Sequence, residues 1–105
     1  MEDRAHLLDD PMVAAADEAA GVLKALSNPA RLKLLCALVP GEKSVGELEA
    51  ILDARQAYVS AQLARLRAEG LVETRREGRA IHYRLADPRV TPVLERLYEV
   101  FCPTA

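Results

Sequence analysis

The 105-residue sequence contains no tryptophan, one phenylalanine and three tyrosines, and it has only two cysteines and two histidines. No stretch approaches the roughly 20 consecutive apolar residues that span a bilayer. The acidic N-terminus lacks the basic and apolar segments of a signal peptide, so we expect a cytoplasmic protein with no membrane partner. In that reducing compartment two cysteines are not expected to form a permanent disulfide. They are free thiols, metal ligands or a switch.

The sequence also lacks the patterns that enzymes need. It has no glycine-rich phosphate motif and no legible cysteine–histidine pair, and Cys36 and Cys102 are not adjacent as in a thiol oxidoreductase. Two distant cysteines and two scattered histidines do not readily supply the four nitrogen or sulfur ligands of a zinc site. We therefore expect no enzymatic activity, no cofactor and no metal site.

Positive charge is concentrated in one third of the chain. The formal net charge is −2, but residues 54–86 hold seven arginines and three glutamates, whereas residues 1–53 hold five basic and ten acidic residues. Arginine suits both phosphate and guanine contacts, and the acidic remainder would repel DNA and so favour one orientation of binding. The charge distribution therefore indicates that residues 54–86 face double-stranded DNA.

A helix-turn-helix pattern begins at Ser44. Ser44 and Glu47 have the spacing of a capping box, in which each side chain satisfies a backbone N–H at the start of a helix. Apolar residues then recur at helical spacing up to a break near Asp53, and a second helix ends at Gly70, a typical C-terminal cap. In a helix-turn-helix the second helix enters the DNA major groove, so we interpret it as the recognition helix.

The segment after the second helix has the pattern of a β-hairpin. Two runs rich in strand-forming residues, 71–76 and 80–85, flank a turn near Gly78. A short solvated hairpin of any α+β domain would have the same local pattern. Its position directly after a recognition helix favours the wing of a winged helix, which can follow the phosphate backbone or reach the minor groove.

The candidate DNA contacts lie on the second helix and on the hairpin. The outer face of that helix carries no acidic residue before Glu69, and glutamine can pair with adenine as arginine can with guanine. Arg79, at the tip of the hairpin, is the best candidate of the wing. At each position a solvated surface residue is the alternative. The predicted contacts are Gln56, Ala57, Tyr58, Ser60, Ala61, Gln62, Arg65, Arg75, Arg79 and His82.

The expected fold is a winged helix-turn-helix, mainly α-helical with a β-hairpin wing. Four helices precede the two strands of the wing and one helix follows them, and the first two helices cover residues 11–26 and 29–39. A chain of this length forms one domain. We expect residues 1–10 to be a flexible acidic arm and residues 11–102 to form the DNA-binding and dimerisation domain.

The last helix carries an apolar stripe that is wide for a monomer of this size. Its members are Val93, Leu94, Leu97, Tyr98 and Phe101, of which the last four are the predicted interface residues. We interpret the stripe as a homodimer interface, formed together with the alanine-rich first helix, because small domains often gain stability by dimerising. The alternative is that the stripe packs against its own domain.

Two segments carry a family resemblance. They are Ser27-Asn28-Pro29-Ala30-Arg31-Leu32-Lys33-Leu34-Leu35, and Gln56-Ala57-Tyr58-Val59-Ser60-Ala61-Gln62-Leu63-Ala64-Arg65-Leu66 followed by Glu69-Gly70-Leu71-Val72. On these motifs the sequence resembles the ArsR/SmtB repressors, homodimeric winged-helix proteins of bacteria, over residues 12–102. The resemblance implies a repressor that binds an inverted-repeat operator. Two features depart from the family: Ala54-Arg55 replaces the usual Ser or Thr cap of the recognition helix, and the metal-binding motifs of the family's metal sensors are missing.

The placement of Cys36 and Cys102 resembles the persulfide-sensing, BigR/SqrR-like branch of that family. The resemblance implies that persulfide or polysulfide links the two thiols through additional sulfur atoms, releases the operator and de-represses sulfide-detoxification genes. Such attack is ordinary thiol exchange, and a bridge with extra sulfur tolerates a wider gap than a disulfide.

Several alternatives remain open at this point. The same repressor could sense oxidants through a simple disulfide or respond to a metal, and the winged helix could bind only protein. Cys36 could be no more than a small buried packing residue.

Overall fold

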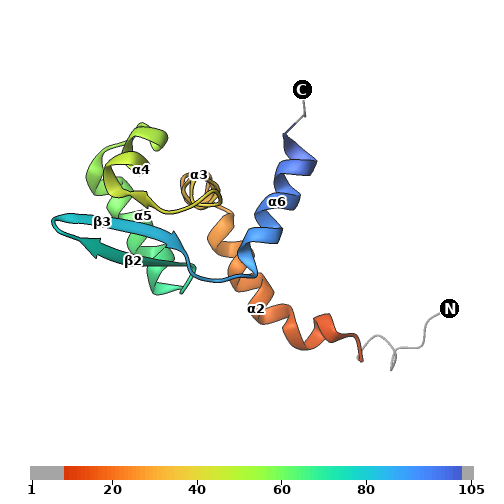
Figure 1. Cartoon of the computed structure of the whole chain (residues 1–105). Helices are drawn as coiled ribbons and strands as arrows, with labels where there is room; N and C mark the ends of the chain where they lie inside the picture. The colour runs from red at the N-terminus through yellow and green to blue at the C-terminus, as the bar shows by residue number, and fades with distance from the viewer. Residues whose placement is uncertain (1–8, 103–105) are drawn as a thin grey trace.

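The computed structural model describes residues 9–102 of the chain (Figure 1). With the labels of Figure 1, the elements are α2 (Pro11–Leu26), α3 (Pro29–Ala37), β1 (Lys43–Ser44), α4 (Val45–Leu52), α5 (Gln56–Ala68), β2 (Val72–Glu77), β3 (Ala80–Leu85) and α6 (Val90–Phe101). This is the predicted winged helix-turn-helix with one additional short strand, β1. Of the arm expected over residues 1–10, only Asp9 and Asp10 lie within the described residues, so that boundary stays a prediction.

The first two helices begin at side-chain caps. The Asp10 carboxylate accepts the N–H of Met12 at 2.8 Å, and the Asn28 side chain accepts the N–H of Arg31 at 3.1 Å. Helix α3 ends at Ala37, two residues before the predicted end. The reason is that the next two N–H groups bond to carbonyls three residues back, at 3.1 and 3.2 Å, which tightens the chain before Pro40.

The helix-turn-helix forms as the sequence predicts. The Ser44 hydroxyl accepts the N–H of Glu47 at 3.1 Å, and the Ser44 N–H donates to the Glu47 carboxylate at 3.0 Å, which completes the capping box. Asp53 ends α4 in the left-handed region with φ of 50°. Gly70 follows α5 with φ of 75°, a conformation that favours glycine. Helix α5 starts without a side-chain cap, as its Ala54-Arg55 entry indicated.

The three strands form one antiparallel sheet in the order β1-β3-β2, with β2 and β3 as the wing. The core lies where α3, α4, α5 and α6 meet the base of this sheet. Its fully buried side chains include Leu34, Leu35, Leu48, Val59, Leu63, Leu66 and Leu94. The wing and α2 project away from this core on opposite sides (Figure 1). None of the helices between residues 9 and 102 has the length and apolar character needed to cross a membrane.

The apolar stripe of α6 divides into two sets. Leu94 is fully buried in the core of its own protomer, so the expectation that it contacts a partner is wrong and the alternative of packing within the domain holds for this residue. Leu97 is half-buried, whereas Tyr98 and Phe101 are 45% and 75% exposed. The outer side of α2 is also apolar and exposed, at Met12, Val13 and Leu23. Contact of these exposed residues with a second copy stays a prediction.

Candidate functional site

Helix α5 presents a polar face to solvent because its apolar side anchors it in the core. Val59, Leu63 and Leu66 have no exposed surface. Six of the predicted DNA contacts on this helix are exposed to solvent: Gln56, Ala57, Tyr58, Ser60, Ala61 and Arg65. Gln62 differs from them, since it is half-buried and its Oε1 accepts a hydrogen bond from Arg31 Nη1 at 3.3 Å.

The wing brings Arg79 next to the recognition helix. Gln56 and Ser60 of α5 line one groove together with Arg79 of the hairpin and the start of α4. His82 lies half-buried on β3, opposite Ser44 of β1 and Arg75 of β2. The tertiary structure therefore brings two of the predicted helix contacts, Gln56 and Ser60, to the same groove as Arg79 at the wing tip.

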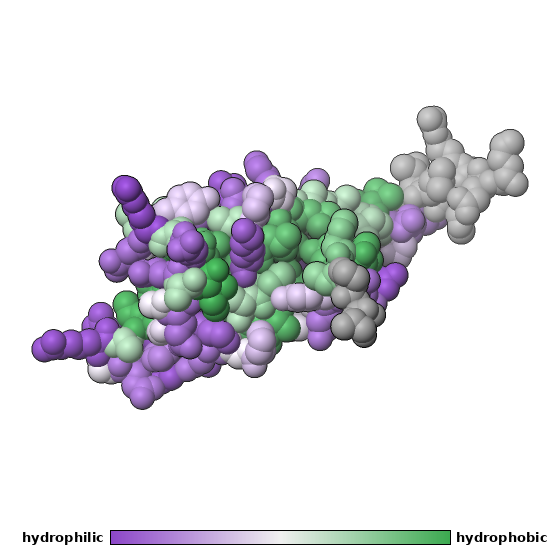
Figure 2. Space-filling model, turned by 90° about the horizontal axis from the view of Figure 1, so that it is seen from above, coloured by the Kyte–Doolittle hydropathy of each residue, from purple (hydrophilic) through white to green (hydrophobic). Residues whose placement is uncertain are grey.

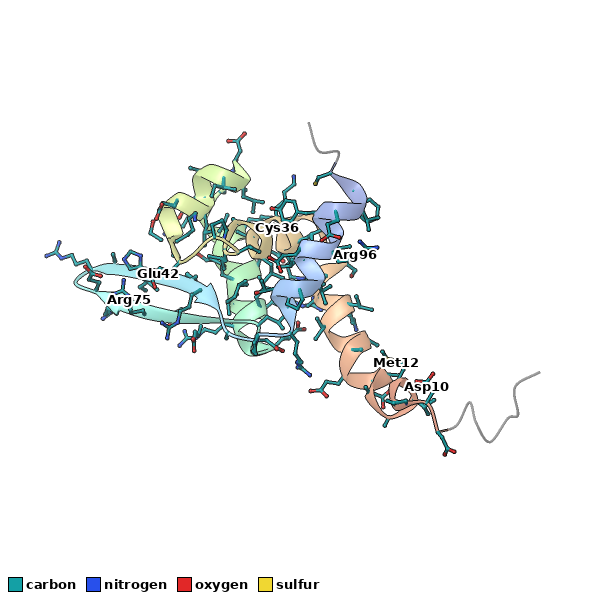
Figure 3. The ribbon with its side chains drawn as sticks, turned by 45° about the vertical axis from the view of Figure 1, so that its right-hand side comes forward. Asp10, Met12, Cys36, Glu42, Arg75 and Arg96 are labelled. Carbon is teal, nitrogen blue, oxygen red and sulfur yellow. The ribbon has the colours of Figure 1, made fainter. Side chains whose placement is uncertain are left out.

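The arginines of the wing are not equivalent. The Arg75 guanidinium forms ion pairs with Glu42 and, at 2.7 Å, with Glu77, and Figure 3 shows Glu42 beside it. Hydrogen bonding from Arg75 holds the pKa of both carboxyl groups below its ordinary value. Arg84 pairs with Glu73 at 2.8 Å, whereas within residues 9–102 no ion pair involves Arg79. A DNA contact by Arg75 would therefore require breaking pairs that Arg79 does not have.

Hydropathy separates the molecule into two ends. In Figure 2 hydrophilic side chains gather around the wing, and hydrophobic ones dominate the middle of the view. The exposed apolar residues of α2 and α6 belong to the end away from the wing. The polar surface predicted to meet DNA is thus separate from the apolar surface predicted to meet a second copy.

Cys36 and Cys102, distant in sequence, line the same cavity of about 380 Å³ between α3 and α6. Its other lining residues are Leu32, Lys33, Leu97, Tyr98 and Phe101. Cys36 is half-buried on the side of α3 that faces α6 (Figure 3), and Cys102 is exposed at the end of α6. Both are free thiols. The cavity wall is apolar apart from Lys33 and the tyrosine hydroxyl, so a thiol inside it is partly removed from water.

Opposing effects act on the Cys36 thiol. Burial raises its pKa, and the negative charge that Cys102 can carry raises it further. Hydrogen bonding from the Tyr98 hydroxyl acts in the opposite direction and favours the thiolate. Tyr98 itself has a raised pKa, caused by burial and then by hydrogen bonding with Cys36. The Tyr98 side chain thus lines the cavity beside both thiols.

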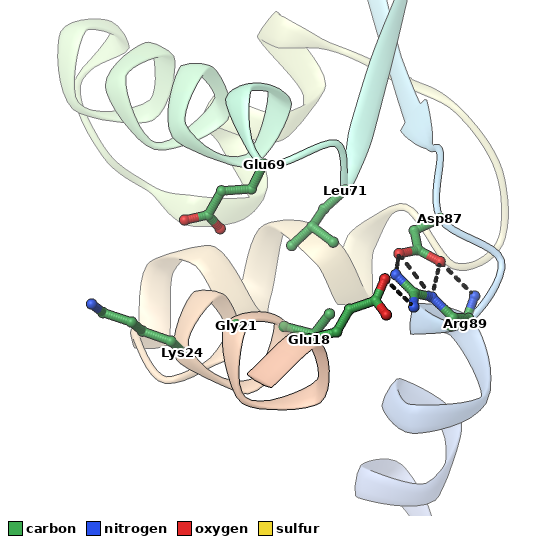
Figure 4. A pocket seen from close by; sticks show the side chains of 8 residues that line it. Glu18, Gly21, Lys24, Glu69, Leu71, Asp87 and Arg89 are labelled. Atoms are coloured by element: carbon green, nitrogen blue, oxygen red, sulfur yellow. Dashed lines mark hydrogen bonds and ion pairs between the residues drawn. The ribbon is translucent and has the colours of Figure 1, made fainter. Parts of the chain in front are cut away.

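Two arginines that connect helices, Arg89 and Arg31, were not among the functional residues predicted from the sequence. Arg89 joins Glu18 of α2, at 2.9 Å, to Asp87 before α6, at 2.7 Å, and this ion cluster lines one side of a pocket (Figure 4). Its hydrogen bonds lower the pKa of Asp87 to about 2. Arg31 is 7% exposed and bonds to the end of α2. Arg31 and Lys33 are the only charged residues of α3, and a cation in a largely apolar helix was the signal that could have identified Arg31.

A metal site has little support in the described part of the chain. Within residues 9–102 no three His, Cys, Asp or Glu side chains are grouped so that they could hold a metal ion. The site that the structure does assemble is a pair of thiols.

Comparison with known proteins agrees with the fold. Residues 28–74 match the family described as "Bacterial regulatory protein, arsR family". The chain is 54% identical over 87 residues to the biofilm growth-associated repressor of Agrobacterium fabrum, which covers 83% of this chain and 74% of that protein. The chain belongs to the ArsR family. Its members are DNA-binding transcriptional regulators, which confirms the predicted family and the expectation that the chain is not an enzyme.

Two solved structures are similar in fold to this ArsR-family chain. The transcriptional repressor BigR from Xylella fastidiosa has a TM-score of 0.85 and 46% sequence identity, covering 89% of this chain and 95% of that one. The homodimeric winged helix-turn-helix DNA-binding domain Mb0332 from Mycobacterium bovis has a TM-score of 0.73 and 36% identity, covering 88% and 85%. These likenesses confirm the winged helix-turn-helix fold.

Proposed function

We propose that this ArsR-family chain is a cytoplasmic, homodimeric repressor that leaves its operator when persulfides or polysulfides react with Cys36 and Cys102. The observation that carries the proposal is the cavity shared by the two thiols. Its support from comparison is the similarity to two proteins that are named as repressors, from Agrobacterium fabrum and Xylella fastidiosa.

DNA recognition is assigned to the outer face of α5 and the tip of the wing. Gln56 and Arg65 are suited to base edges, Ser60 and Arg79 to phosphates, and the small side chains of Ala57 and Ala61 let the helix approach the groove closely. Tyr58 is placed for a thymine methyl group or a phosphate. Two copies of α5 about 34–36 Å apart would read the two halves of an inverted repeat.

Dimerisation is assigned to the exposed apolar residues of α2 and α6. Met12, Val13 and Leu23 of α2 and Phe101 of α6 are each more than half exposed in the protomer. Apolar surface of this extent is stabilised when a second copy covers it. The homodimeric domain from Mycobacterium bovis, which shares the fold, supports this assignment.

The thiol chemistry can be written as two exchange steps. The exposed Cys102 thiolate attacks an inner sulfur of a polysulfide, forms a new S–S bond and expels a shorter polysulfide anion. The Cys36 thiolate then attacks the sulfur next to the terminal SH of the chain on Cys102, forms a second S–S bond and breaks the terminal one, so that the end sulfur leaves as hydrosulfide. The two thiols lose two electrons in total, and the polysulfide is reduced by the same two electrons. Burial raises the pKa of the Cys36 thiol, and hydrogen bonding with Tyr98 only partly offsets that rise, so the second step is assigned to Cys36 and the first to the exposed Cys102.

The cavity leaves room for a bridge with extra sulfur. A direct disulfide requires Cα atoms within about 7 Å, whereas each inserted sulfur widens the allowed gap. A cavity of about 380 Å³ with an apolar wall accommodates an uncharged sulfur chain between the two thiols. The bridge would tie α3, which packs under the recognition helix, to the end of α6 at the predicted dimer interface, and so change the separation of the two α5 helices.

The decisive experiment is the intact mass of the reduced protein after anaerobic polysulfide treatment, followed by digestion. The proposal expects added sulfur on one cross-linked peptide pair that contains Cys36 and Cys102. Cys36→Ser should bind DNA as the unsubstituted protein does and no longer be released by polysulfide. Hydrogen peroxide is the matched reagent: release by peroxide with no sulfur added would instead favour the oxidant sensor. An unchanged mass after polysulfide, or release that persists in Cys36→Ser, would refute the proposal.

A further inference from the structure

A buried guanidinium joins the end of α2 to the recognition helix. Arg31 is 7% exposed, and its Nε donates to the carbonyl of Ala25 at 2.8 Å while Nη2 donates to the carbonyl of Lys24 at 3.3 Å. Both carbonyls belong to the last turn of α2, where backbone partners run out and the helix dipole is negative. Arg31 therefore closes the C-terminal end of α2 from a position in the first turn of α3.

The third contact of the same guanidinium reaches the centre of α5. Arg31 Nη1 donates to Oε1 of Gln62 at 3.3 Å, and Gln62 is half-buried, whereas Gln56 on the same helix is exposed. The guanidinium is planar, and its donors diverge in fixed directions. A shift of the α2–α3 corner must therefore either move Gln62 or break this hydrogen bond.

We propose that Arg31 and Gln62 form a strut that transmits movement of α3 to the recognition helix, and that Gln62 is a positioning residue instead of a base contact. The regulatory half of this inference rests on the proposed thiol switch. Arg31 and Cys36 lie on the same nine-residue helix, and Leu32, the neighbour of Arg31, lines the thiol cavity. A sulfur bridge at Cys36 would move α3, and Arg31 would move with it because it lies on the same helix.

The hydrogen bond between Arg31 and Gln62 is sensitive to helix movement because the charge of Arg31 is buried. An arginine removed from water is stable only while its donors remain bonded, so loss of one acceptor has a larger effect than loss of a hydrogen bond on the surface. The apolar contacts between α3 and α5 are non-directional and tolerate small sliding, whereas the bonds of a planar guanidinium do not. The hydrogen bond between Arg31 and Gln62 is therefore a directional contact between α3, which carries Cys36, and the recognition helix α5.

Three variants test the strut. Gln62→Met keeps the length and removes the acceptor, Gln62→Glu keeps an acceptor oxygen for Arg31, and Gln56→Met is the matched control on the same helix outside the strut. For each, the DNA affinity of the reduced dimer and of the polysulfide-treated dimer is measured, and their ratio is compared with that of the unsubstituted protein. Allosteric ratios are typically about 5–150-fold.

The strut predicts that Gln62→Met reduces this ratio by about fivefold or more. Gln62→Glu should restore the ratio, even though its charge weakens binding of both forms. Gln56→Met should weaken both forms equally and leave the ratio unchanged. An unchanged ratio in Gln62→Met would overturn the inference and return Gln62 to the set of direct DNA contacts.

Failure of the proposed function would be recognised separately. If polysulfide does not release DNA from the unsubstituted protein, the thiol switch is wrong, and the strut is then judged by hydrogen exchange of the α5 backbone amides in the reduced dimer. Faster exchange in Gln62→Met, with protection restored in Gln62→Glu, would support the strut. Equal exchange in all three proteins would overturn it.

Discussion

Neutralising Arg79 should reduce the salt dependence of DNA binding, whereas neutralising Arg75 should change it little. Arg79 follows Gly78 at the exposed tip of the wing, and it takes part in no ion pair within the described chain. Arg75 is held between Glu42 and Glu77, so its charge is already balanced inside the protein. Arg79→Gln and Arg75→Gln are therefore a matched pair that remove the same charge from the same hairpin.

The size of the effect follows from the number of phosphates contacted. Each neutralised phosphate of B-DNA contributes about −0.9 to the slope of log K against log salt. A homodimer presents two wings, so Arg79→Gln should make the slope less negative by about 1.8. A doubling of the salt concentration should then weaken the unsubstituted protein by about 3.5-fold more than the variant.

Fluorescence anisotropy at several KCl concentrations, on a duplex selected from a random library, measures these slopes for the reduced proteins. Thermal unfolding of both variants checks that the hairpin substitution leaves the domain folded. Two results would refute the reasoning: an Arg79→Gln slope equal to that of the unsubstituted protein, or a larger change in Arg75→Gln. The second result would mean that Arg75 exchanges its carboxylates for phosphates when DNA binds.

Three further predictions concern stability, assembly and thiol reactivity. Ser44→Ala removes one half of the capping box and should lower the free energy of unfolding by about 1 kcal/mol in urea titrations; no change would show that Glu47 caps the helix alone. Leu94→Ala should lower the free energy of unfolding of each protomer by about 2–5 kcal/mol, because this side chain is fully buried. Phe101→Asp, at a residue that is 75% exposed, should instead shift the dimer to monomer in sedimentation velocity while the protomer stays folded. Because burial raises the pKa of Cys36, its alkylation in Cys102→Ser, followed by mass spectrometry, should be slow at pH 7 and keep rising at pH values where an unhindered thiol has levelled off. A plateau at the ordinary thiol pKa would contradict the buried environment.

Local chemistry made much of the fold predictable. The capping box of Ser44 and Glu47, the Asn28-Pro29 start of α3 and the glycine after α5 act within one or two turns of chain, and each lies where the sequence predicted it. The buried side of α5 was predictable for the same reason, since Val59, Leu63 and Leu66 recur at helical spacing. The short strand β1 was not predictable, because two residues become a strand only when β3 lies beside them.

The features of the candidate site also divide into those set by local sequence and those set by tertiary packing. The sequence by itself determined the helices and the wing, the basic recognition segment, the family motifs and the presence of two thiols, one within α3 and one at the end of α6. Only the tertiary structure decided that Cys36 and Cys102 share a cavity, that Leu94 belongs to the core, and that Arg75 has ion-pair partners whereas Arg79 has none among residues 9–102. It also decided that Arg31 bonds to Gln62, a residue 31 positions away. Each of these facts depends on contacts between helices and strands that are distant in the chain, and the packing of the whole domain, not any local pattern, sets those contacts.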